Sequence, residues 1–249
     1  TLAREMVDRD FLVFAPKLKT NVLAHGLTGA FKLNIGILCD KERMWCHHYD
    51  LDKKIVDLAE VGRPDFIATD AVECAIGGNQ LTERGRHLGA VLMATDPLAH
   101  DVVCAHILHL DPERIGHLKL ASERGYGSLD LGSIEVAGDI TLDELRDRTK
   151  DWDLGFIHAS KLQGRMRVLC GEPYCTGGCH GVFLDWIYMI RDRKPKLWDN
   201  LPEWTVVIGE YKSDVEAKRV LLLGTCTKIL GKVKARRKIR IKGCPPKHK

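Results

Sequence analysis

Five cysteines in the last third of the chain have surroundings typical of metal or cluster ligands. Cys175 and Cys179 are separated by three residues in the glycine-rich segment PYCTGGCHG, Cys226 follows an apolar run, and Cys244 precedes two prolines. Glycine lets backbone N–H groups approach an anionic centre, and proline after a ligand cysteine is found in iron–sulfur proteins. These four cysteines are therefore predicted to bind a 4Fe-4S cluster, with Cys170 as a spare ligand.

Other interpretations of these thiols stay open. Zinc also accepts four thiolates, although structural zinc sites usually contain two close cysteine pairs and only one is present here. A redox disulfide between Cys175 and Cys179 is a second alternative, although the spacing is not C-x-x-C. Free buried thiols are a third, which the Gly- and Pro-rich surroundings disfavour. His158 and His180 are further candidate ligands, although a histidine beside a cysteine is more often only its neighbour.

The other cysteines and the chain start bear on the compartment. Cys39, Cys46, Cys74 and Cys104 lie in apolar or mixed segments and are expected to be small buried residues. The cysteine count of nine is odd and the first residues contain no signal-peptide core, so a secreted disulfide protein is not expected. No stretch approaches the length of a transmembrane helix. The protein is expected to be cytoplasmic, and an upstream segment is expected because the chain begins with Thr1.

A second group of polar residues in the first half of the chain is predicted to be catalytic. Lys17, Lys19 and His25 place hydrogen-bond donors in one glycine-containing loop after a predicted strand. Such a loop suits an anionic substrate or a partner carboxylate, with a solvated loop as the alternative. Asp70 and Glu73 follow the next strand and precede two glycines, which suits an acid/base pair.

Several further polar residues are expected to be structural. Asp96 precedes a proline at the start of a predicted helix and is expected to cap it. Asp101, one helical turn on, is expected either to face the same cleft or to be solvated. The remaining histidines of the first half are expected at the surface or packed: His47, His48, His100, His106 and His109.

The elements that must position these residues alternate between strands and helices. Strands are predicted over residues 11–16, 65–70, 89–95, 134–136, 165–170, 204–209 and 219–224. Helices are predicted over 50–61, 97–110, 112–125 and 181–191, with a capping box opening another at Thr141. This alternation predicts an α/β fold with a mostly parallel sheet flanked by helices. The composition changes after Asp151, which predicts an α/β domain over 1–155 and a smaller cysteine-rich α/β region over 156–249.

The end of the chain is strongly basic although the whole chain carries a net charge of only +4. Residues 232–249 contain lysines and arginines but no acid, and two interpretations stay open. The segment is either a solvated charged helix and terminus or a docking surface for an anionic partner. No aromatic residues are interleaved with the charges, which disfavours nucleic acid as that partner.

Long blocks of the first half resemble one known family. In the family's order and spacing, over residues 11–138, they resemble the domain-of-unknown-function 362 family of predicted iron–sulfur proteins. The resemblance implies an α/β fold and association with 4Fe-4S clusters in anaerobic bacteria and archaea, but no single reaction. The blocks are APKLKTNVLAHGLTGAFKLNIG (15–36), DFIATDAVECAIGG (65–78), GAVLMATDPLAHDVVCAHILHLDP (89–112) and HLKLASERGYGSLDLGSIEVAG (117–138).

Two departures from the family limit what the resemblance implies. Many relatives carry a ferredoxin-type cysteine run that this chain lacks, and the usual Lys-Asn pair stands here as Lys32-Leu33-Asn34. We expect an iron–sulfur protein that transfers electrons, or an oxidoreductase that reduces a small anionic substrate. A non-catalytic cluster carrier, assembly factor or electron-transfer subunit is the alternative. A structural zinc protein that binds nucleic acid through its basic tail is a weaker one. The expected partners are a redox protein or the anionic substrate, and no membrane.

Overall fold

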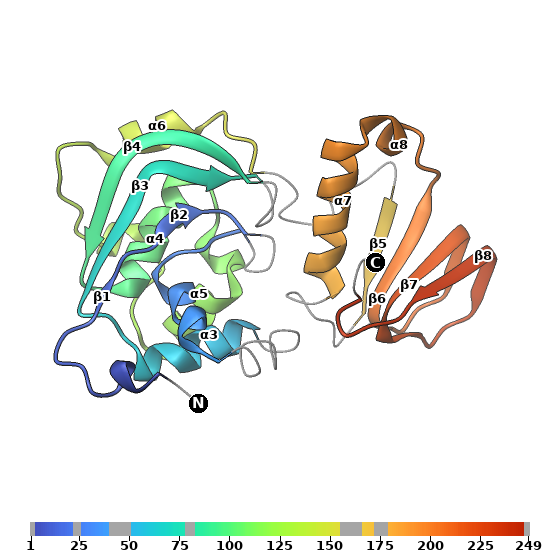
Figure 1. Cartoon of the computed structure of the whole chain (residues 1–249), viewed down its shortest axis with the longest axis horizontal. Helices are drawn as coiled ribbons and strands as arrows, with labels where there is room; N and C mark the ends of the chain where they lie inside the picture. The colour runs from blue at the N-terminus through green and yellow to red at the C-terminus, as the bar shows by residue number, and fades with distance from the viewer. Residues whose placement is uncertain are drawn as a thin grey trace. The chain divides into compact units, whose positions relative to one another are not determined.

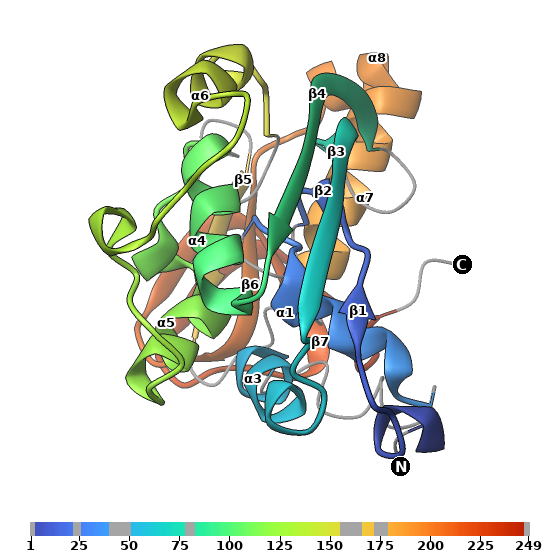
Figure 2. The ribbon, with the colours of Figure 1, turned by 90° about the vertical axis from the view of Figure 1, so that its left-hand side faces the viewer.

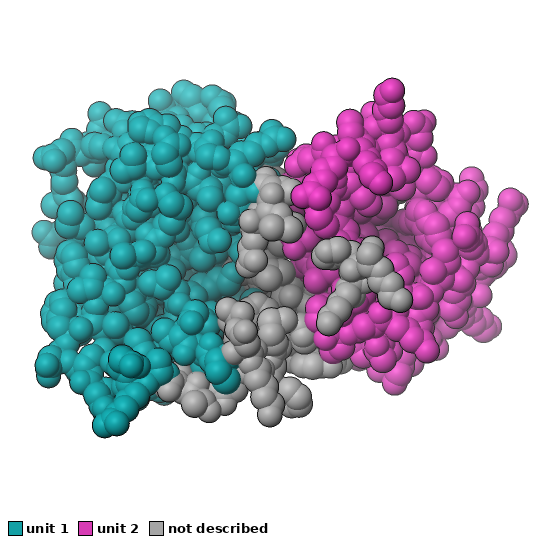
Figure 3. Space-filling model, in the orientation of Figure 1, with its two compact units in different colours: residues 1–46, 51–155 teal, residues 47–50, 156–249 magenta. Residues whose placement is uncertain are grey.

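The computed structural model describes residues 3–21, 26–39, 51–77, 83–154, 166–171 and 179–246. The chain forms two compact units, the first over residues 1–46 and 51–155 and the second over 47–50 and 156–249 (Figure 3). Each unit combines helices with a mostly parallel sheet, which confirms the predicted α/β class (Figure 1). Every helix in the described parts of the chain is too short or too polar to span a bilayer.

The sheet of the first unit is organised around one long central strand, β3 (Phe66–Ile76). Strands β1 (Val13–Phe14) and β2 (Lys17–Lys19) pair with it in parallel, one after the other. Strand β4 (Arg84–Ala94) pairs with it antiparallel along nearly its whole length. Because β4 occupies one edge of β3, β1 and β2 share the other edge and form one interrupted strand.

Burial alternates along β3, which explains why helices cover one face of this sheet. Ile67, Thr69 and Ala71 are buried, whereas Asp70 and Val72 between and beside them are exposed. Such alternation is typical of a sheet with one face on the core and one in solvent. Figure 2 shows α4 and α5 on the same side of the β3–β4 pair. The helices of this unit are α1 (Ala30–Leu33), α3 (Leu51–Val61), α4 (Pro97–Ile107), α5 (Gly116–Glu123) and α6 (Leu142–Thr149).

Two helix starts confirm the capping that the sequence predicts. The Asp96 side chain accepts hydrogen bonds from Leu98 N and Ala99 N at the start of α4. At α6, the Thr141 side chain accepts from Glu144 N while the Glu144 carboxylate accepts from Thr141 N, a complete capping box. Each cap satisfies backbone donors that the first helical turn leaves unpaired.

Other local predictions for the first unit are wrong. The predicted strand over 134–136 pairs with no described strand and follows a 3-10 turn, Leu131–Ser133. The predicted helix over 112–125 is divided into a 3-10 turn, Pro112–Arg114, and α5. The predicted buried strand over 11–16 is reduced to β1, because Pro16 has no N–H to donate to a ladder. Further 3-10 turns lie at Arg4–Met6 and Asn34–Ile37.

The second unit is built on four parallel strands in chain order. These are β5 (Met166–Cys170), β6 (Trp204–Tyr211), β7 (Val215–Ile229) and β8 (Val233–Ile241). Helices α7 (Gly181–Arg193) and α8 (Pro195–Asp199) lie between β5 and β6 in the sequence. The three strands predicted in this region are confirmed, and β6 and β7 are longer than predicted.

Strands β6, β7 and β8 form a coil rather than a flat sheet. Only three residues join each strand to the next, whereas parallel neighbours in a flat sheet need a crossover of a dozen or more. The chain instead bends within the strands, at Gly209 (φ 74°) in β6 and Gly224 (φ 101°) in β7. Val215 then pairs with Val233, and Tyr211 with Ile229, so residues 18 apart in sequence stack upon one another. Each turn of the coil therefore takes 18 residues over this stretch.

The basic segment is a strand, not the helix or tail that the sequence suggested. Strand β8 is the last strand of its sheet in the described part of the chain, and its outer edge carries many cations. Lys234 forms an ion pair with Glu216 (Nζ–Oε1 2.7 Å) on the neighbouring strand. The exposed basic residues along and beside β8 are Lys232, Lys234, Arg236, Arg237, Lys238, Arg240 and Lys242.

Candidate functional site

Two of the predicted ligand cysteines, Cys226 and Cys244, come directly after a corner of the coil. They lie in successive turns, at the same corner. Thr225 N donates a hydrogen bond to Gly243 O (3.0 Å), and Gly243 N donates one to Thr225 Oγ1 (3.0 Å). Thr225 and Gly243 are followed directly by Cys226 and Cys244, whose side chains are both exposed. The stacking of the coil thus places the residues that precede Cys226 and Cys244 side by side, although the two cysteines are far apart in the sequence.

Cys179 reaches the same corner from the start of α7. A Cβ atom on Gly224 would lie 2.6 Å from Cys179 Sγ, so the sulfur sits directly against the Gly224 backbone. Glycine is required at position 224 for two reasons: a side chain would collide with the sulfur, and the φ angle is positive. Cys179 is only 3% exposed and lies two residues before Gly181, where α7 begins.

The corner supplies thiols from three chain segments without a closed metal site among the described residues. Within those ranges no group of three His, Cys, Asp or Glu is close enough together to hold a metal ion. Cys175, the fourth predicted ligand, lies outside them, as does His158. Cys170 ends β5, and burial raises the pKa of its thiol to about 11. A thiol that keeps its proton is the poorer ligand, so Cys170 stays the spare.

Two of the four cysteines of the first unit that were predicted to be buried are confirmed as buried. Cys74 and Cys104 are buried, and burial raises the pKa of Cys74 to about 12. Cys39 is exposed, so the expectation that it is buried is wrong. Cys46 lies outside the described residues.

Lys17 and Asp70 form an ion pair across the sheet. Lys17 Nζ lies 2.6 Å from Asp70 Oδ2 and donates a second hydrogen bond to Glu73 O (2.7 Å). The hydrogen bond from Lys17 holds the pKa of Asp70 below its usual value. Both residues lie within strands β2 and β3, rather than in the loops where the sequence suggested them, because β3 extends to Ile76.

Glu73 and Lys19 have their own partners on the same sheet. Glu73 Oε1 lies 2.7 Å from His87 Nδ1 on β4, and Lys19 Nζ lies 3.5 Å from Glu83 Oε1. Burial raises the pKa of Glu83, whose side chain is 15% exposed. His25 lies outside the described residues. The predicted acids are thus each paired with a neighbouring basic residue, Lys17 or His87, and neither acid lines the cavity described next.

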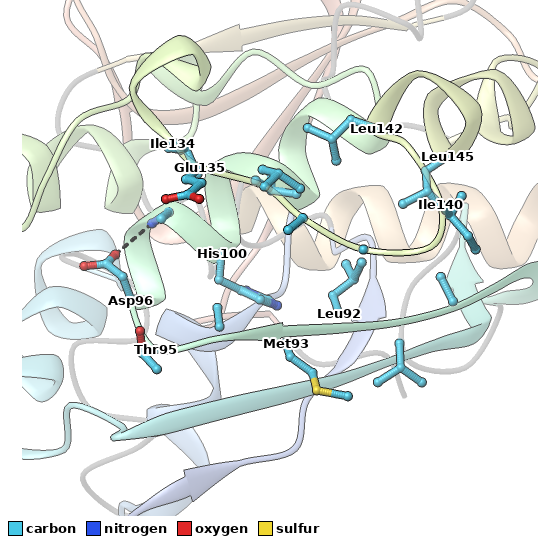
Figure 4. A pocket seen from close by; sticks show the side chains of 18 of the residues that line it. Leu92, Met93, Thr95, Asp96, His100, Ile134, Glu135, Ile140, Leu142 and Leu145 are labelled. Atoms are coloured by element: carbon cyan, nitrogen blue, oxygen red, sulfur yellow. Dashed lines mark hydrogen bonds between the residues drawn. The ribbon is translucent and has the colours of Figure 1, made fainter.

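A cavity of about 940 Å³ lies in the first unit between β4, α4 and the segment 127–145. Figure 4 shows Leu92 and His100 beside this space, with Thr95, Asp96 and Glu135 gathered at one end. Leu142, Leu145 and Ile140 lie at the other end. The cavity therefore has a polar end and an apolar end. Nothing in the sequence pattern identifies it, since it depends on a loop predicted to contain a strand.

His100, on α4, is the centre of a buried polar network beside the cavity. Its Nε2 lies 2.7 Å from Thr69 Oγ1 and 3.6 Å from Cys104 Sγ, and its Nδ1 lies 2.7 Å from Asp101 Oδ1. Burial lowers the pKa of His100, but Cys104 and Asp101 raise it more, to about 10. The expectation of a packed histidine is correct, and its packing includes an ionic partner.

Asp101 links α4 to α1, which neither interpretation of this residue anticipated. Its carboxylate accepts hydrogen bonds from Ala30 N (2.7 Å) and Phe31 N (3.1 Å), and it is fully buried. A Cβ atom on Gly29 would collide with this carboxylate, so glycine precedes α1 for a steric reason. Asp101 is therefore a cap supplied by another helix.

The fold and the site describe an α/β protein. Its first unit has a sheet with helices on one face, and its second unit has a β-coil that carries exposed cysteines. Residues 1–106 match the model of a family described as a domain of unknown function (DUF362). The resemblance seen in the first blocks is confirmed, while the block over 117–138 lies beyond the matched residues. No curated protein and no solved structure matches the chain.

Proposed function

We propose that the second unit binds an iron–sulfur cluster, the predicted 4Fe-4S cofactor, through Cys175, Cys179, Cys226 and Cys244. In this proposal the protein transfers electrons or reduces a small anionic substrate in the cytoplasm. The observation that supports it is the contact of Cys179 Sγ with the Gly224 backbone, at the corner where Thr225 and Gly243 are hydrogen-bonded. Four thiolates are the usual ligand set for such clusters, and a bound cluster supplies one-electron chemistry.

The charges around the corner support an anionic thiolate site. Arg240 Nη1 donates hydrogen bonds to Gly224 O (3.2 Å) and Thr225 O (3.3 Å), directly before Cys226. Lys242 lies two residues before Cys244. A cluster held by four thiolates is anionic, and basic residues near such a site offset part of that charge. The same donors also suit zinc, so the metal must be identified by experiment.

Single serine substitutions test the ligand set. Cys226→Ser and Cys244→Ser, each purified anaerobically, are expected to lose at least half of the iron and sulfide bound by the unchanged protein. Cys39→Ser is the matched control, because Cys39 is also exposed but belongs to the first unit. Unchanged iron content in Cys226→Ser and Cys244→Ser would remove both residues from the ligand set.

A second candidate, an electron-transfer subunit, is favoured by the free basic edge of β8. A cationic strand of this kind attracts an acidic partner over a distance set by ionic strength, and also prevents pairing with other strand edges. Reversal of Arg237 and Lys238 to glutamate is expected to slow electron exchange with an acidic ferredoxin at least tenfold. Salt-sensitive, tight binding of a single-stranded DNA oligonucleotide would instead favour the nucleic-acid alternative.

A further inference from the structure

The cavity of the first unit has the dimensions and lining of a small-molecule site. Its volume of about 940 Å³ lies within the range of ligand pockets. Most of its lining is apolar, from Leu92 on β4 to Leu142 and Leu145 on α6. A ligand here would place an apolar body against these side chains, and its polar group would have to meet the residues at the opposite end.

The ionisable side chains that line the cavity are mainly acidic. The charged side chains that line the cavity are Asp96, Glu135 and Asp139, together with His100, and no lysine or arginine joins them among the described residues. His100 is already balanced by Asp101, and Asp96 is paired with Arg63 (Oδ2–Nη2 3.1 Å) and caps α4. Glu135 and Asp139 form no ion pair within the described part of the chain and are exposed.

We propose that this cavity binds a small amphipathic amine, with its apolar chain toward Leu142 and its ammonium group toward Glu135. An ammonium group adds a charge-assisted hydrogen bond to a carboxylate that otherwise has none. A carboxylate-bearing ligand of the same shape would meet only repulsion there. This inference concerns the first unit and does not rest on the proposed cluster, so either can fail without the other.

Binding of octylamine, 1-octanol and octanoate to the full chain, measured by calorimetry, tests the proposal. The three probes share one tail length and differ in the charge of the head group. Octylamine is expected to bind about threefold more tightly than octanol, with octanoate weakest, because Glu135 attracts the ammonium group and repels the carboxylate, while its exposure weakens both effects. Butylamine is expected to bind at least tenfold more weakly than octylamine, since it buries four fewer methylene groups against the apolar lining.

Two variants locate the site. Glu135→Gln is expected to abolish the preference for octylamine over octanol, whereas Glu113→Gln, an exposed acid outside the cavity, leaves it intact. Ala99→Phe, which adds a ring to the cavity wall, is expected to weaken octylamine at least tenfold. No binding of any probe, equal binding of amine and carboxylate, or full binding by Ala99→Phe would each overturn the proposal.

Discussion

The two units use their polar residues in different ways. In the first unit the polar side chains whose types suit catalysis have structural partners: Lys17 pairs with Asp70, and Asp101 caps α1. In the second unit Cys226 and Cys244 are exposed at a corner, away from the buried side chains of the coil. A residue type that suits catalysis therefore indicates function only where the residue has no structural partner.

The largest effect is expected from removing the cap that joins α4 to α1. Asp101→Ala leaves Ala30 N, Phe31 N and the His100 imidazole without their buried carboxylate. Breaking one side of a buried ionic network costs about 3–5 kcal/mol. Hydrogen exchange of the β3 amides under native conditions is expected to report this loss of stability in the first unit.

Asp96→Ala serves as the control for that experiment. Asp96 also caps a helix but is half-buried, so its loss is expected to cost about 1 kcal/mol. If the two variants were equally stable, Asp101 would not hold the first unit together. Protection of the β7 amides in the second unit should be unchanged in both variants, which separates the two regions.

A smaller effect is expected from the glycine that contacts Cys179. In Gly224→Ala the new methyl group meets the sulfur and the residue keeps a positive φ, together costing about 1–3 kcal/mol. Gly125 has a similar φ but no neighbour within 4 Å, so Gly125→Ala is destabilised by backbone strain alone. The proposal also predicts lower iron content in Gly224→Ala only. Equal iron content in both variants would count against Cys179 as a ligand.

The stability of the first unit is expected to fall as the pH rises from about 6.5 to 9. The folded pKa of His100 is about 10, above its ordinary value of 6.5. The protonated form therefore stabilises the fold below pH 6.5, and that contribution is lost progressively as the pH rises toward 10. Above pH 9 Cys74 adds a loss of its own, because its folded pKa is about 12. A flat profile between pH 6.5 and 9, or the same slope in His100→Gln, would contradict this assignment.

The smallest effect is expected from the exposed pair that the sequence marked as catalytic. Lys17→Met should leave the stability of the first unit almost unchanged, since exposed ion pairs contribute little. It should raise the pKa of Asp70 toward its ordinary value, because the hydrogen bond from Lys17 is the main cause of its lowering. Carbonyl chemical shifts titrated by NMR measure this change. An unaltered Asp70 pKa would mean that the pair does not form in solution.

Local signals predicted the fold better than the sites. The Asp96 cap, the capping box at Thr141 and the apolar runs of β6 and β7 are short-range patterns, and all of them are confirmed. The coil was missed because its 18-residue stacking depends on bends at Gly209 and Gly224, and the two turns share no repeated motif. The Asp101 cap and the cavity were missed because each joins segments far apart in the sequence.

The metal content of the unchanged protein is the most direct test of the proposed cluster. Iron, zinc and acid-labile sulfide should be measured on anaerobically purified full chain, together with its visible spectrum. About four iron and four sulfide per chain, with broad absorption near ~400 nm, are predicted for a cluster held by four cysteines. About one zinc per chain, without sulfide or colour, would contradict the redox proposal and make the cysteine corner a structural thiolate site.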